Sequence, residues 1–243
     1  MRQYRGGMEI IHLTGIEGAR LARGTVVVID VIRSFTVSAY ALGGGARECL
    51  LVPTVAQALA LHRSIPGSLI SAEEEALPVP GIAISNSPTQ IKQADLKGRV
   101  LVQRSSAGTT VMAAVESSED LYAASLVVAG ATVKACMAAH PDVLTLLASA
   151  DHPEDHACAR YIEGLIRGEQ PDLERLLQPL RDSERYARAL SGTWPGFPPT
   201  DVELSLAPDL FDFAMPATRR TDCLRLTAVS PLPLGGAFSK ARP

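Results

Sequence analysis

Residues 100–115 read VLVQRSSAGTTVMAAV, and this stretch gives the clearest indication of the fold. An apolar run of strand length is followed by a cluster of arginine, serine and threonine, and then by a helical pattern that begins at Gly108. A strand that passes through a short polar turn into a helix is typical of a βα unit. In sheets built from such units, ligands bind beyond the carboxyl ends of the strands.

Apolar runs of strand length alternate with helical patterns along most of the chain. This alternation predicts an α/β fold of three layers, α/β/α, in which a mostly parallel or mixed sheet lies between helices. The predicted strands are Val26–Ile29, Glu48–Val52, Ser68–Ser71, Val100–Val102 and Val143–Ala148. The predicted helices are Ser34–Leu42, Val55–His62, Ser87–Gln93, Gly108–Val115, Val127–Ala139 and Glu154–Ile166.

The composition is that of a soluble enzyme with one large core. The chain has 243 residues, of which 47% are hydrophobic, and this is enough for a sizeable buried core. We expect a single domain over residues 1–243, with a helical and then extended C-terminal appendage from about residue 170. A net charge of −3 and the lack of a basic stripe argue against a nucleic-acid partner.

The sequence also lacks the features of a membrane or exported protein. No apolar run reaches the roughly 18 residues that a membrane-spanning helix needs. The first residues, MRQYRGGMEIIHLTG, contain no signal-peptide core. The four cysteines lie far apart without a CxxC pair, which indicates buried thiols in a reducing compartment. We therefore expect a cytoplasmic protein with no membrane partner.

A second stretch repeats the order of the first. Residues 26–39 read VVVIDVIRSFTVSA, so an apolar strand again leads through an arginine and a serine into a helix. Arg33 and Ser34 here correspond to Arg104 and Ser105 in the first stretch. A helix N-terminus offers free backbone N–H groups to an anion, and arginine adds a planar pair of donors for phosphate or sulfonate. The two strand ends therefore predict an anion-binding site.

The polar residues of the first stretch also have a simpler interpretation. Ser105, Ser106 and Thr109 are of the types that commonly cap the start of a helix without binding any ligand. The repetition of the pattern, with an arginine each time, favours the ligand. Gly108 agrees with this choice, because a glycine lets the backbone approach an anion closely.

Carboxylates near the ends of predicted strands indicate a site for a hard cation. Asp30 ends one strand, Glu73 follows another, and Asp155 comes shortly after a third. Such oxygen ligands suit Mg²⁺, which also bridges to a substrate phosphate. Asp30 is the strongest candidate, because a carboxylate after VVVI is costly to bury unless something satisfies it. A solvated acidic turn at Glu73 and a helix-dipole partner at Asp155 are the simpler interpretations of the other two.

Two further features leave both a structural and a functional interpretation open. His152 and His156 are four residues apart and could face a metal together, although a solvated helix start without an HExxH pattern is the simpler interpretation. In GIAISNSPTQI, residues 81–91, Asn86 or Ser87 can cap a helix that begins with proline. An asparagine there can equally orient a ligand.

Taken in order, these segments resemble the 2-phosphosulfolactate phosphatase (ComB) family of coenzyme M biosynthesis. The resemblance rests on five stretches and runs along nearly the whole chain. They are VVVIDVIRSFTVSAYALGGGARECLLV (residues 26–52), AEEEALPVPGIAISNSP (72–88), VQRSSAGTT (102–110), EDHACARYIEGLI (154–166) and DVELSLAPDLFDFAMP (201–216).

The resemblance implies an α/β/α fold and a Mg²⁺-dependent phosphoric monoester hydrolase that converts 2-phosphosulfolactate to 3-sulfolactate and phosphate. Its substrate would be a small-molecule phosphate ester, and a homodimer is a compatible assembly. The predicted catalytic residues are Asp30, Arg33 and Arg104. The predicted metal ligands are Asp30, Glu73 and Asp155. The predicted substrate-binding residues are Ser34, Asn86, Ser87, Ser105, Ser106, Gly108 and Thr109.

In the expected reaction, the phosphoryl group is transferred from the ester to water. Arg33 and Arg104 would neutralise charge on the transferred group, while Asp30 helps to hold the cation. Asp30 as a nucleophile stays open, although Ile32 stands where a haloacid-dehalogenase signature needs a second aspartate. The sequence contains neither GxxxxGK[ST] nor GxSxG, which disfavours a nucleotide-dependent kinase or transferase and a serine hydrolase.

Two positions depart from the family pattern. Glu74 stands where the family usually has an arginine, and Ala83 where it often has an aspartate. A carboxylate at position 74 would repel an anionic ester if it faced the site. These departures keep two alternatives open: a phosphatase for another phosphorylated hydroxy acid, and a non-catalytic anion-binding domain.

Overall fold

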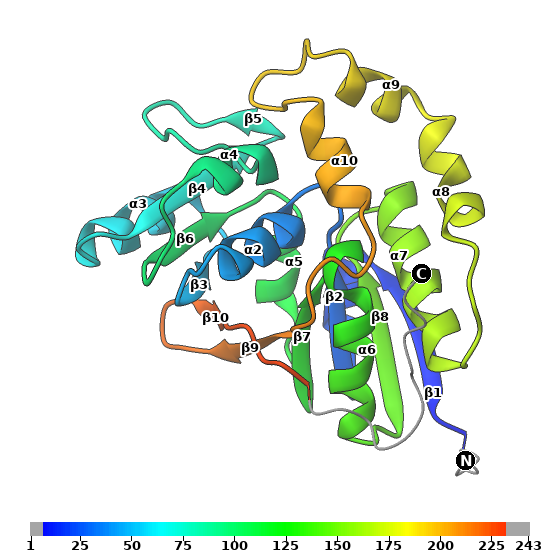
Figure 1. Cartoon of the computed structure of the whole chain (residues 1–243). Coiled ribbons are helices and arrows are strands. Elements are labelled where there is room, and N and C mark those ends of the chain that lie inside the picture. Colours follow the sequence, from blue (N-terminus) through cyan, green and yellow to red (C-terminus); the bar gives the residue numbers. More distant parts are fainter. Residues whose placement is uncertain (1–6, 232–243) are drawn as a thin grey trace.

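The strands of the protein form one ten-stranded sheet with helices packed on it (Figure 1). The structure is a computed structural model that describes residues 7–231. The predicted α/β class and the mixed, mostly parallel sheet are confirmed. The two ends of the predicted domain, residues 1–6 and 232–243, lie outside the described residues. The single domain therefore stays a prediction.

The sheet consists of two parallel halves joined by an antiparallel ribbon. One half contains, in spatial order, β1 (Glu9–Thr14), β8 (Val143–Ala148), β2 (Thr25–Ile29) and β7 (Asp120–Ala124). The ribbon consists of β9 (Met215–Arg219) and β10 (Leu224–Leu226). The other half contains β3 (Glu48–Leu51), β6 (Val100–Arg104) and β4 (Leu69–Glu74), with the short β5 (Leu77–Pro78) antiparallel at its edge.

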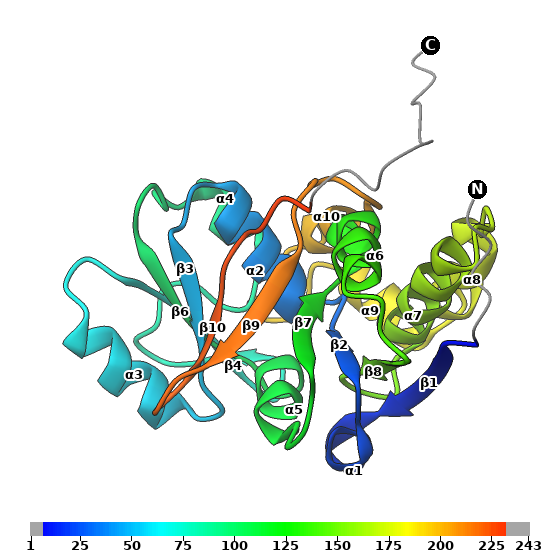
Figure 2. The same ribbon diagram turned by 90° about the horizontal axis from the view of Figure 1, so that it is seen from below.

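The ribbon makes the two parallel halves run in opposite directions. The path from β7 to β3 crosses the antiparallel pairs β7·β9, β9·β10 and β10·β3, and an odd number of reversals inverts the strand direction. Figure 2 shows β9 and β10 between the two groups of strands. The residues that follow β2 and β6 are nevertheless in contact, because the Ser105 hydroxyl donates to Ser34 Oγ at 2.9 Å. The opposed halves thus bring two of their carboxyl ends together.

Helices lie on both faces of the sheet, and every helix and strand predicted from the sequence is present. The ends differ from the predicted ones by at most three residues, as at β4, which continues to Glu74. The helices are α1 (Gly15–Leu21), α2 (Ser34–Gly43), α3 (Val55–Ser64), α4 (Pro88–Gln93), α5 (Gly108–Ala114), a 3₁₀ turn (Leu126–Val128), α6 (Ala129–Ala138), α7 (Pro153–Ile166), α8 (Leu173–Arg181), α9 (Glu184–Leu190) and α10 (Thr200–Leu206). Within the described chain, no helix has both the length and the apolar character needed to cross a bilayer.

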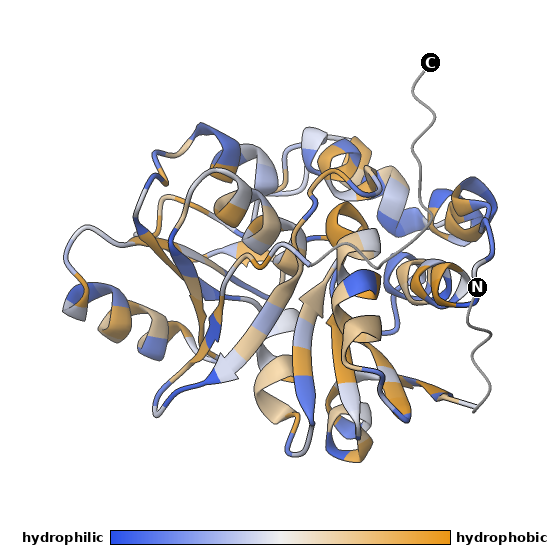
Figure 3. Ribbon diagram, turned by 60° about the horizontal axis from the view of Figure 1, so that its bottom comes forward, coloured by the Kyte–Doolittle hydropathy of each residue, from blue (hydrophilic) through white to orange (hydrophobic). Residues whose placement is uncertain are grey.

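Strand β2 shows why the sequence forms a two-faced core. Its run VVVI is completely buried, as expected for a parallel strand covered on both sides. Successive side chains of a strand point to opposite faces. Val28 therefore packs in a cluster with Phe35 of α2, whereas Ile29 packs in a second cluster with Ile162 of α7. Figure 3 shows this apolar character along the strands and on the helices that cover them.

The extended part of the predicted C-terminal appendage is not peripheral. β9 and β10 occupy the middle of the sheet, and Met215, Leu224 and Leu226 are buried in the core shared with β2 and α2. The helical part forms α8, α9 and α10 around the other cluster. The segment after residue 170 therefore completes both the sheet and the core.

A buried carboxylate fixes β3 to the ribbon. Glu48, with a side chain only 8% exposed, lies 2.5 Å from Arg225 Nε, 3.4 Å from Arg220 Nη2 and 3.5 Å from Arg47 Nη2. Burial alone would raise the pKa of Glu48, but the three arginines hold it below its ordinary value of 4.5. A carboxyl whose pKa is lower in the folded state stabilises the fold above its unfolded pKa. That contribution is lost as the pH falls through the lowered value.

We expect Glu48→Gln to decrease the free energy of unfolding at pH 7 by about 1–2 kcal/mol, since the charged partners are themselves partly exposed. The difference from the parent protein should shrink once the pH is below 4.5. Urea unfolding at about pH 7 and about pH 3 measures both values. Glu116→Gln, at an exposed glutamate with no ion pair in the described chain, is the control. Equal destabilisation at the two pH values would contradict this account.

Candidate active site

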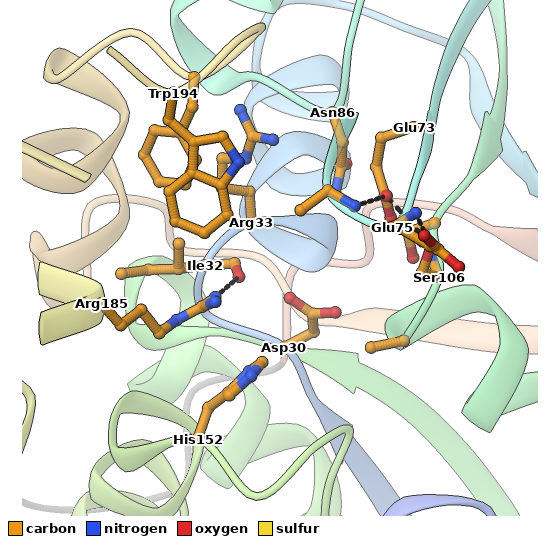
Figure 4. Close-up of a pocket in the computed structure, with 14 residues that line it drawn as sticks. Asp30, Ile32, Arg33, Glu73, Glu75, Asn86, Ser106, His152, Arg185 and Trp194 are labelled. Carbon is orange, nitrogen blue, oxygen red and sulfur yellow. Dashed lines mark hydrogen bonds between the residues drawn. The ribbon is translucent and has the colours of Figure 1, made fainter. Parts of the chain in front are cut away.

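A pocket of about 260 Å³ opens where the ends of β2 and β6 meet (Figure 4). Asp30 lies in the middle of the residues drawn, with Arg185 and His152 on one side and Glu73 and Ser106 on the other. Six predicted site residues line the pocket: Asp30, Arg33, Glu73, Asn86, Ser105 and Ser106. The rest of the lining is Ile32, Glu75, Ala76, Ala107, His152, Arg185, Trp194 and Phe197.

Asp30 is held at the end of β2 by the first turn of α2. Its Oδ1 accepts a hydrogen bond from Ser34 N at 2.9 Å. Its Oδ2 has no hydrogen bond within 3.5 Å to a described residue, and the Ser149 side chain lies near the same carboxyl. A Cβ atom on residue 108 would lie 2.6 Å from this Oδ2, so Gly108 allows the start of α5 to approach the carboxylate. The sequence predicted that Gly108 lets the backbone approach a bound anion. In the structure, the group close to Gly108 is the Asp30 carboxylate.

The surroundings of Asp30 disfavour its charged form. Burial raises the pKa of Asp30, and the hydrogen bond from Ser34 and the nearby His152 and Ser149 lower it by less. The Glu73 carboxylate raises it further. A buried carboxyl in this state gains from any cation that comes close. The oxygen chemistry of this position therefore fits a hard cation.

Arg33 is almost completely buried beside the pocket. Its Nη1 donates to Asp201 Oδ2 at 2.8 Å and to Gly196 O at 2.7 Å, and its guanidinium lies 4.1 Å from the centre of the Phe197 ring. Burial lowers the pKa of Arg33, and the hydrogen bond to Asp201 opposes that shift. The other N–H groups of Arg33 make no hydrogen bond to a described residue. They are available to an anion in the pocket.

Arg104, in contrast, lies behind the pocket wall. It donates to Pro53 O at 3.3 Å, to Ser106 Oγ at 3.2 Å and to the backbone carbonyl of Glu73. Arg104 is absent from the pocket lining. This geometry gives no support to the predicted contact of Arg104 with substrate. Its contacts instead make it a support for the turn that follows β4.

The turn after β4 places Glu73 in the pocket. Glu75 and Ala76 have φ values of 52° and 61°, and this left-handed turn lets Ala76 N donate to Glu73 Oε2 at 2.6 Å. Ser106 donates to both Glu73 oxygens, through its backbone N–H and its hydroxyl. Glu73 is buried, so the simpler interpretation as a solvated acidic turn is wrong for this residue.

Several serines and threonines near the pocket cap helices, and some also line the pocket. Thr109 N donates to Ser105 Oγ at 3.0 Å, and Ser105 N donates to Thr109 Oγ1 at 2.8 Å, so these two residues order the start of α5. Ser105 also lines the pocket, whereas Thr109 and Ser34 do not. Ser87 caps α4 by accepting from Gln90 N at 3.3 Å, and it lies outside the pocket lining.

Asp155 does not face the pocket. Its Oδ1 accepts from Val31 N at 2.8 Å and its Oδ2 from Ser149 Oγ at 3.1 Å. Burial, followed by the nearby Asp30 and Glu154 carboxylates, raises the pKa of Asp155 well above its ordinary value. Its contacts suit a residue that fixes the backbone after Asp30 better than a metal ligand, so only two of the three predicted ligands line the pocket.

The two histidines do not face a common site. His152 lines the pocket, whereas His156 Nε2 lies 2.8 Å from Asp151 Oδ1 at the exposed surface. Across residues 7–231, no three His, Cys, Asp or Glu side chains are grouped so that they could hold a metal ion. A cation at this site would therefore take at most two side-chain ligands from these residue types, with the rest supplied by substrate or water.

The sequence matches the family model of the 2-phosphosulpholactate phosphatases over residues 12–193. The chain belongs to this family. The matched range contains every predicted site residue, from Asp30 to Asp155.

Members of the family from three organisms show the extent of the similarity. The protein "Probable 2-phosphosulfolactate phosphatase" of Bacillus subtilis (strain 168) is 35% identical over 147 residues, which cover 58% of this chain and 64% of that protein. Its namesake in Carboxydothermus hydrogenoformans is 34% identical, over 61% of this chain and 63% of the relative. The namesake in Thermoplasma acidophilum is 30% identical, over 65% and 73%. The chain thus aligns with a little under two thirds of the first two relatives.

Part of the pocket wall was missed by sequence reasoning, and its residues from Trp194 onward lie past the matched family range. Arg185 comes from the short helix α9, and Trp194 and Phe197 come from the loop that follows it. Asp201, which holds Arg33, is fully buried in α10. The sequence carried one signal for this wall: Trp194, the one tryptophan of the chain, stands in the Gly/Pro-rich segment SGTWPGFPPT. An aromatic side chain in such a segment needs a surface to pack against.

Neither departure from the family pattern faces the pocket. The Glu74 side chain is 65% exposed and lies 3.8 Å from Arg104 Nη2. Ala83 is exposed on the segment before α4. Repulsion between Glu74 and a bound anion is therefore weak, because water screens a carboxylate at the surface.

We expect Asp201→Asn to decrease the free energy of unfolding by about 3–5 kcal/mol, because it leaves the buried Arg33 guanidinium without its counterion. Urea unfolding of the purified variant measures this. Glu203→Gln, an exposed position in the same helix, should change stability by less than about 0.5 kcal/mol. The double variant Arg33→Met with Asp201→Asn should recover part of the loss. A stable Asp201→Asn protein would show that Arg33 does not need this carboxylate.

A substitution at position 74 checks the placement of Glu74. Glu74→Arg should leave kcat/KM on any phosphate ester that the protein hydrolyses within about twofold of the parent value, because the side chain is outside the pocket and screened by solvent. Steady-state phosphate release measures it. A change of tenfold or more in either direction would place residue 74 in the site.

Proposed function

We propose that the protein is a Mg²⁺-dependent phosphatase that hydrolyses 2-phosphosulfolactate to 3-sulfolactate and phosphate. The observation that carries this proposal is the pocket at the strand ends, where the free Oδ2 of Asp30 and the free N–H groups of Arg33 line one cavity of about 260 Å³. A carboxylate for a cation and a guanidinium for an anion are the two groups that phosphoryl transfer most needs. Membership of the phosphatase family supports the same reaction class.

In this proposal the phosphate lies between Arg33 and the Ser105–Ser106 segment. Arg33 is fixed by Asp201 and Gly196, so its guanidinium is already oriented before substrate arrives. Ser105 is fixed through the Ser34 hydroxyl and through Thr109. A guanidinium held in place in this way stabilises developing charge without reorganising during the reaction. The hydroxyl and backbone N–H of Ser105 are already donated to Ser34 Oγ and Thr109 Oγ1, so Ser105 shapes this end of the pocket and Arg33 supplies the hydrogen bonds. Asn86, which also lines the pocket, adds an amide at the same end.

The residues present fit Mg²⁺ through two carboxylates. Asp30 offers an oxygen that no described residue occupies, and Glu73 lines the same pocket, although its oxygens already accept bonds from Ser106 and Ala76. One or two carboxylates, with substrate phosphate and water, are what Mg²⁺ commonly takes in phosphate sites. When bound there, the ion would supply charge neutralisation for the phosphate oxygens.

We further propose that water, and not Asp30, attacks the phosphorus. Asp30 Oδ1 accepts from Ser34 N, and Oδ2 is the oxygen assigned to the cation in this proposal, which leaves neither oxygen of the carboxylate to attack phosphorus. A nucleophilic aspartate would leave labelled phosphate on the protein after acid quenching of a reaction with radiolabelled ester. We expect no such label at Asp30.

The decisive assay is phosphate release from 2-phosphosulfolactate with and without Mg²⁺. The parent protein should release phosphate, lose this activity with a chelator, and regain it when Mg²⁺ is added back. Asp30→Asn should decrease kcat/KM by about 100-fold or more, because it removes the charge while keeping an oxygen for Ser34 N.

Two results would overturn the proposal. Full activity after exhaustive metal removal would exclude the role given to the two carboxylates. If the protein hydrolysed other phosphorylated hydroxy acids but not 2-phosphosulfolactate, then 2-phosphosulfolactate would be excluded as its substrate. Glu74→Gln serves as the control for Asp30→Asn, because it removes an acidic charge outside the pocket.

A non-catalytic anion-binding domain is no longer favoured by any specific observation. The alternative rested on Glu74 and Ala83, and both side chains are exposed outside the pocket lining. Asp30, Arg33 and Glu73, which carry the proposed chemistry, are buried and line the pocket.

A further inference from the structure

Arg185 is the second arginine of the pocket, and it comes from a part of the chain far from the strand ends. It projects from α9 and its side chain is 26% exposed. Its Nε donates to Glu154 Oε1 at 3.1 Å and its Nη2 to Ile32 O at 3.1 Å, as Figure 4 shows for the second contact. Nη1 makes no hydrogen bond to a described residue. The guanidinium is thus anchored on one edge and free on the other.

Few cationic side chains line the pocket, and Arg185 is one of them. Of the other two arginines near the site, Arg33 lines the pocket and is the one proposed to bind the phosphate, and Arg104 is behind the wall. No lysine occurs among the described residues that line the pocket. The proposed substrate carries a carboxylate and a sulfonate besides its phosphate, and Arg185 is the one further guanidinium among the described residues that line the pocket.

We propose that Arg185 binds the sulfonate group of the substrate and thereby selects sulfonated phosphate esters. This inference rests on the proposed function. In this inference, Arg185 of α9 recognises the sulfonate, which does not react, and the residues at the strand ends bind the phosphate.

The chemistry of this wall suits a sulfonate on a methylene group. Trp194 and Ile32 line the pocket beside Arg185, and the guanidinium carbon lies 5.7 Å from the centre of the Trp194 ring. Apolar surface of this kind can cover the methylene group. A guanidinium is weakly hydrated and offers several donors in one plane, which matches a large anion with its charge spread over three oxygens.

The contact with Glu154 keeps the arginine in position when no anion is bound. Glu154 is fully buried at the start of α7, and its Oε2 has no hydrogen-bond partner among the described residues. Removing the guanidinium alone would leave this buried carboxylate without its cation, which destabilises a fold. A test of Arg185 must therefore separate recognition from stability.

The test compares two substrates that differ only in the sulfonate: 2-phosphosulfolactate and 2-phospholactate. Arg185→Gln should decrease kcat/KM for 2-phosphosulfolactate by about 10- to 100-fold and change that for 2-phospholactate by less than about threefold. Arg185→Lys should fall between the two proteins, because it keeps the charge and loses the planar donors. Equal losses on both substrates would overturn the assignment.

Two further variants control for the fold. Glu154→Gln with Arg185→Gln removes both charges of the pair, so it should fold as the parent does and show the same loss of discrimination. Arg188→Ala is the matched control, because Arg188 lies on the same helix, 4.1 Å from the centre of the Trp194 ring, and outside the pocket lining. It should keep the parent's ratio of the two kcat/KM values. A ratio that falls in Arg188→Ala as well would overturn the assignment to Arg185.

Binding of 3-sulfolactate separates this inference from the proposed function. Calorimetric titration should show 3-sulfolactate binding the parent protein at least about 10-fold more tightly than lactate, and Arg185→Gln should remove that preference. If no ester is hydrolysed but this preference holds, the phosphatase fails and the sulfonate site stands. If hydrolysis occurs but the preference is the same in both proteins, the sulfonate site fails alone.

Discussion

The buried contact between Asp30, Ser34 and Gly108 is the constraint on which the rest of the site depends. Two parallel half-sheets that run in opposite directions meet here. The start of α5 can lie beside the Asp30 carboxylate because Gly108 has no side chain. The Ser34–Ser105 hydroxyl contact then sets the distance between the two strand ends. A larger residue at position 108 would separate these ends and so open the pocket that they form.

A second constraint ties the front of the chain to its C-terminal part. Asp201 accepts hydrogen bonds from Arg33, Ser87 and Thr89, so one buried carboxylate fixes the arginine and the start of α4 together. A buried ion pair is not a source of great stability in itself, but breaking it is costly. The arrangement therefore holds Arg33 in one orientation. An arginine free to move would lose much of its value for binding a transferred phosphate.

The sequence predicted the strand ends well, because each βα unit is local and its pattern is strong. Asp30, Arg33 and Ser105 were found in this way, and all three line the pocket. The opposed halves were out of reach, since the strands that reverse the direction, in residues 215–226, are short and carry no distinctive pattern. The position of Arg104 was out of reach for a related reason. Two similar Arg-Ser pairs look equivalent in the sequence, but the path of the β4–β5 turn places Arg104 against the Glu73 carbonyl and outside the pocket lining.

The one tryptophan of the chain stands in the pocket wall, stacked on Phe197 with 5.0 Å between ring centres and flanked by two guanidinium groups. Indole emission responds to nearby charge and to exclusion of water. Light emitted by this protein on excitation of its indole therefore comes from one place, beside the proposed ligand. The molecule carries its own optical reporter, and no label, second chromophore or engineered residue is needed to follow occupancy of the cavity in real time.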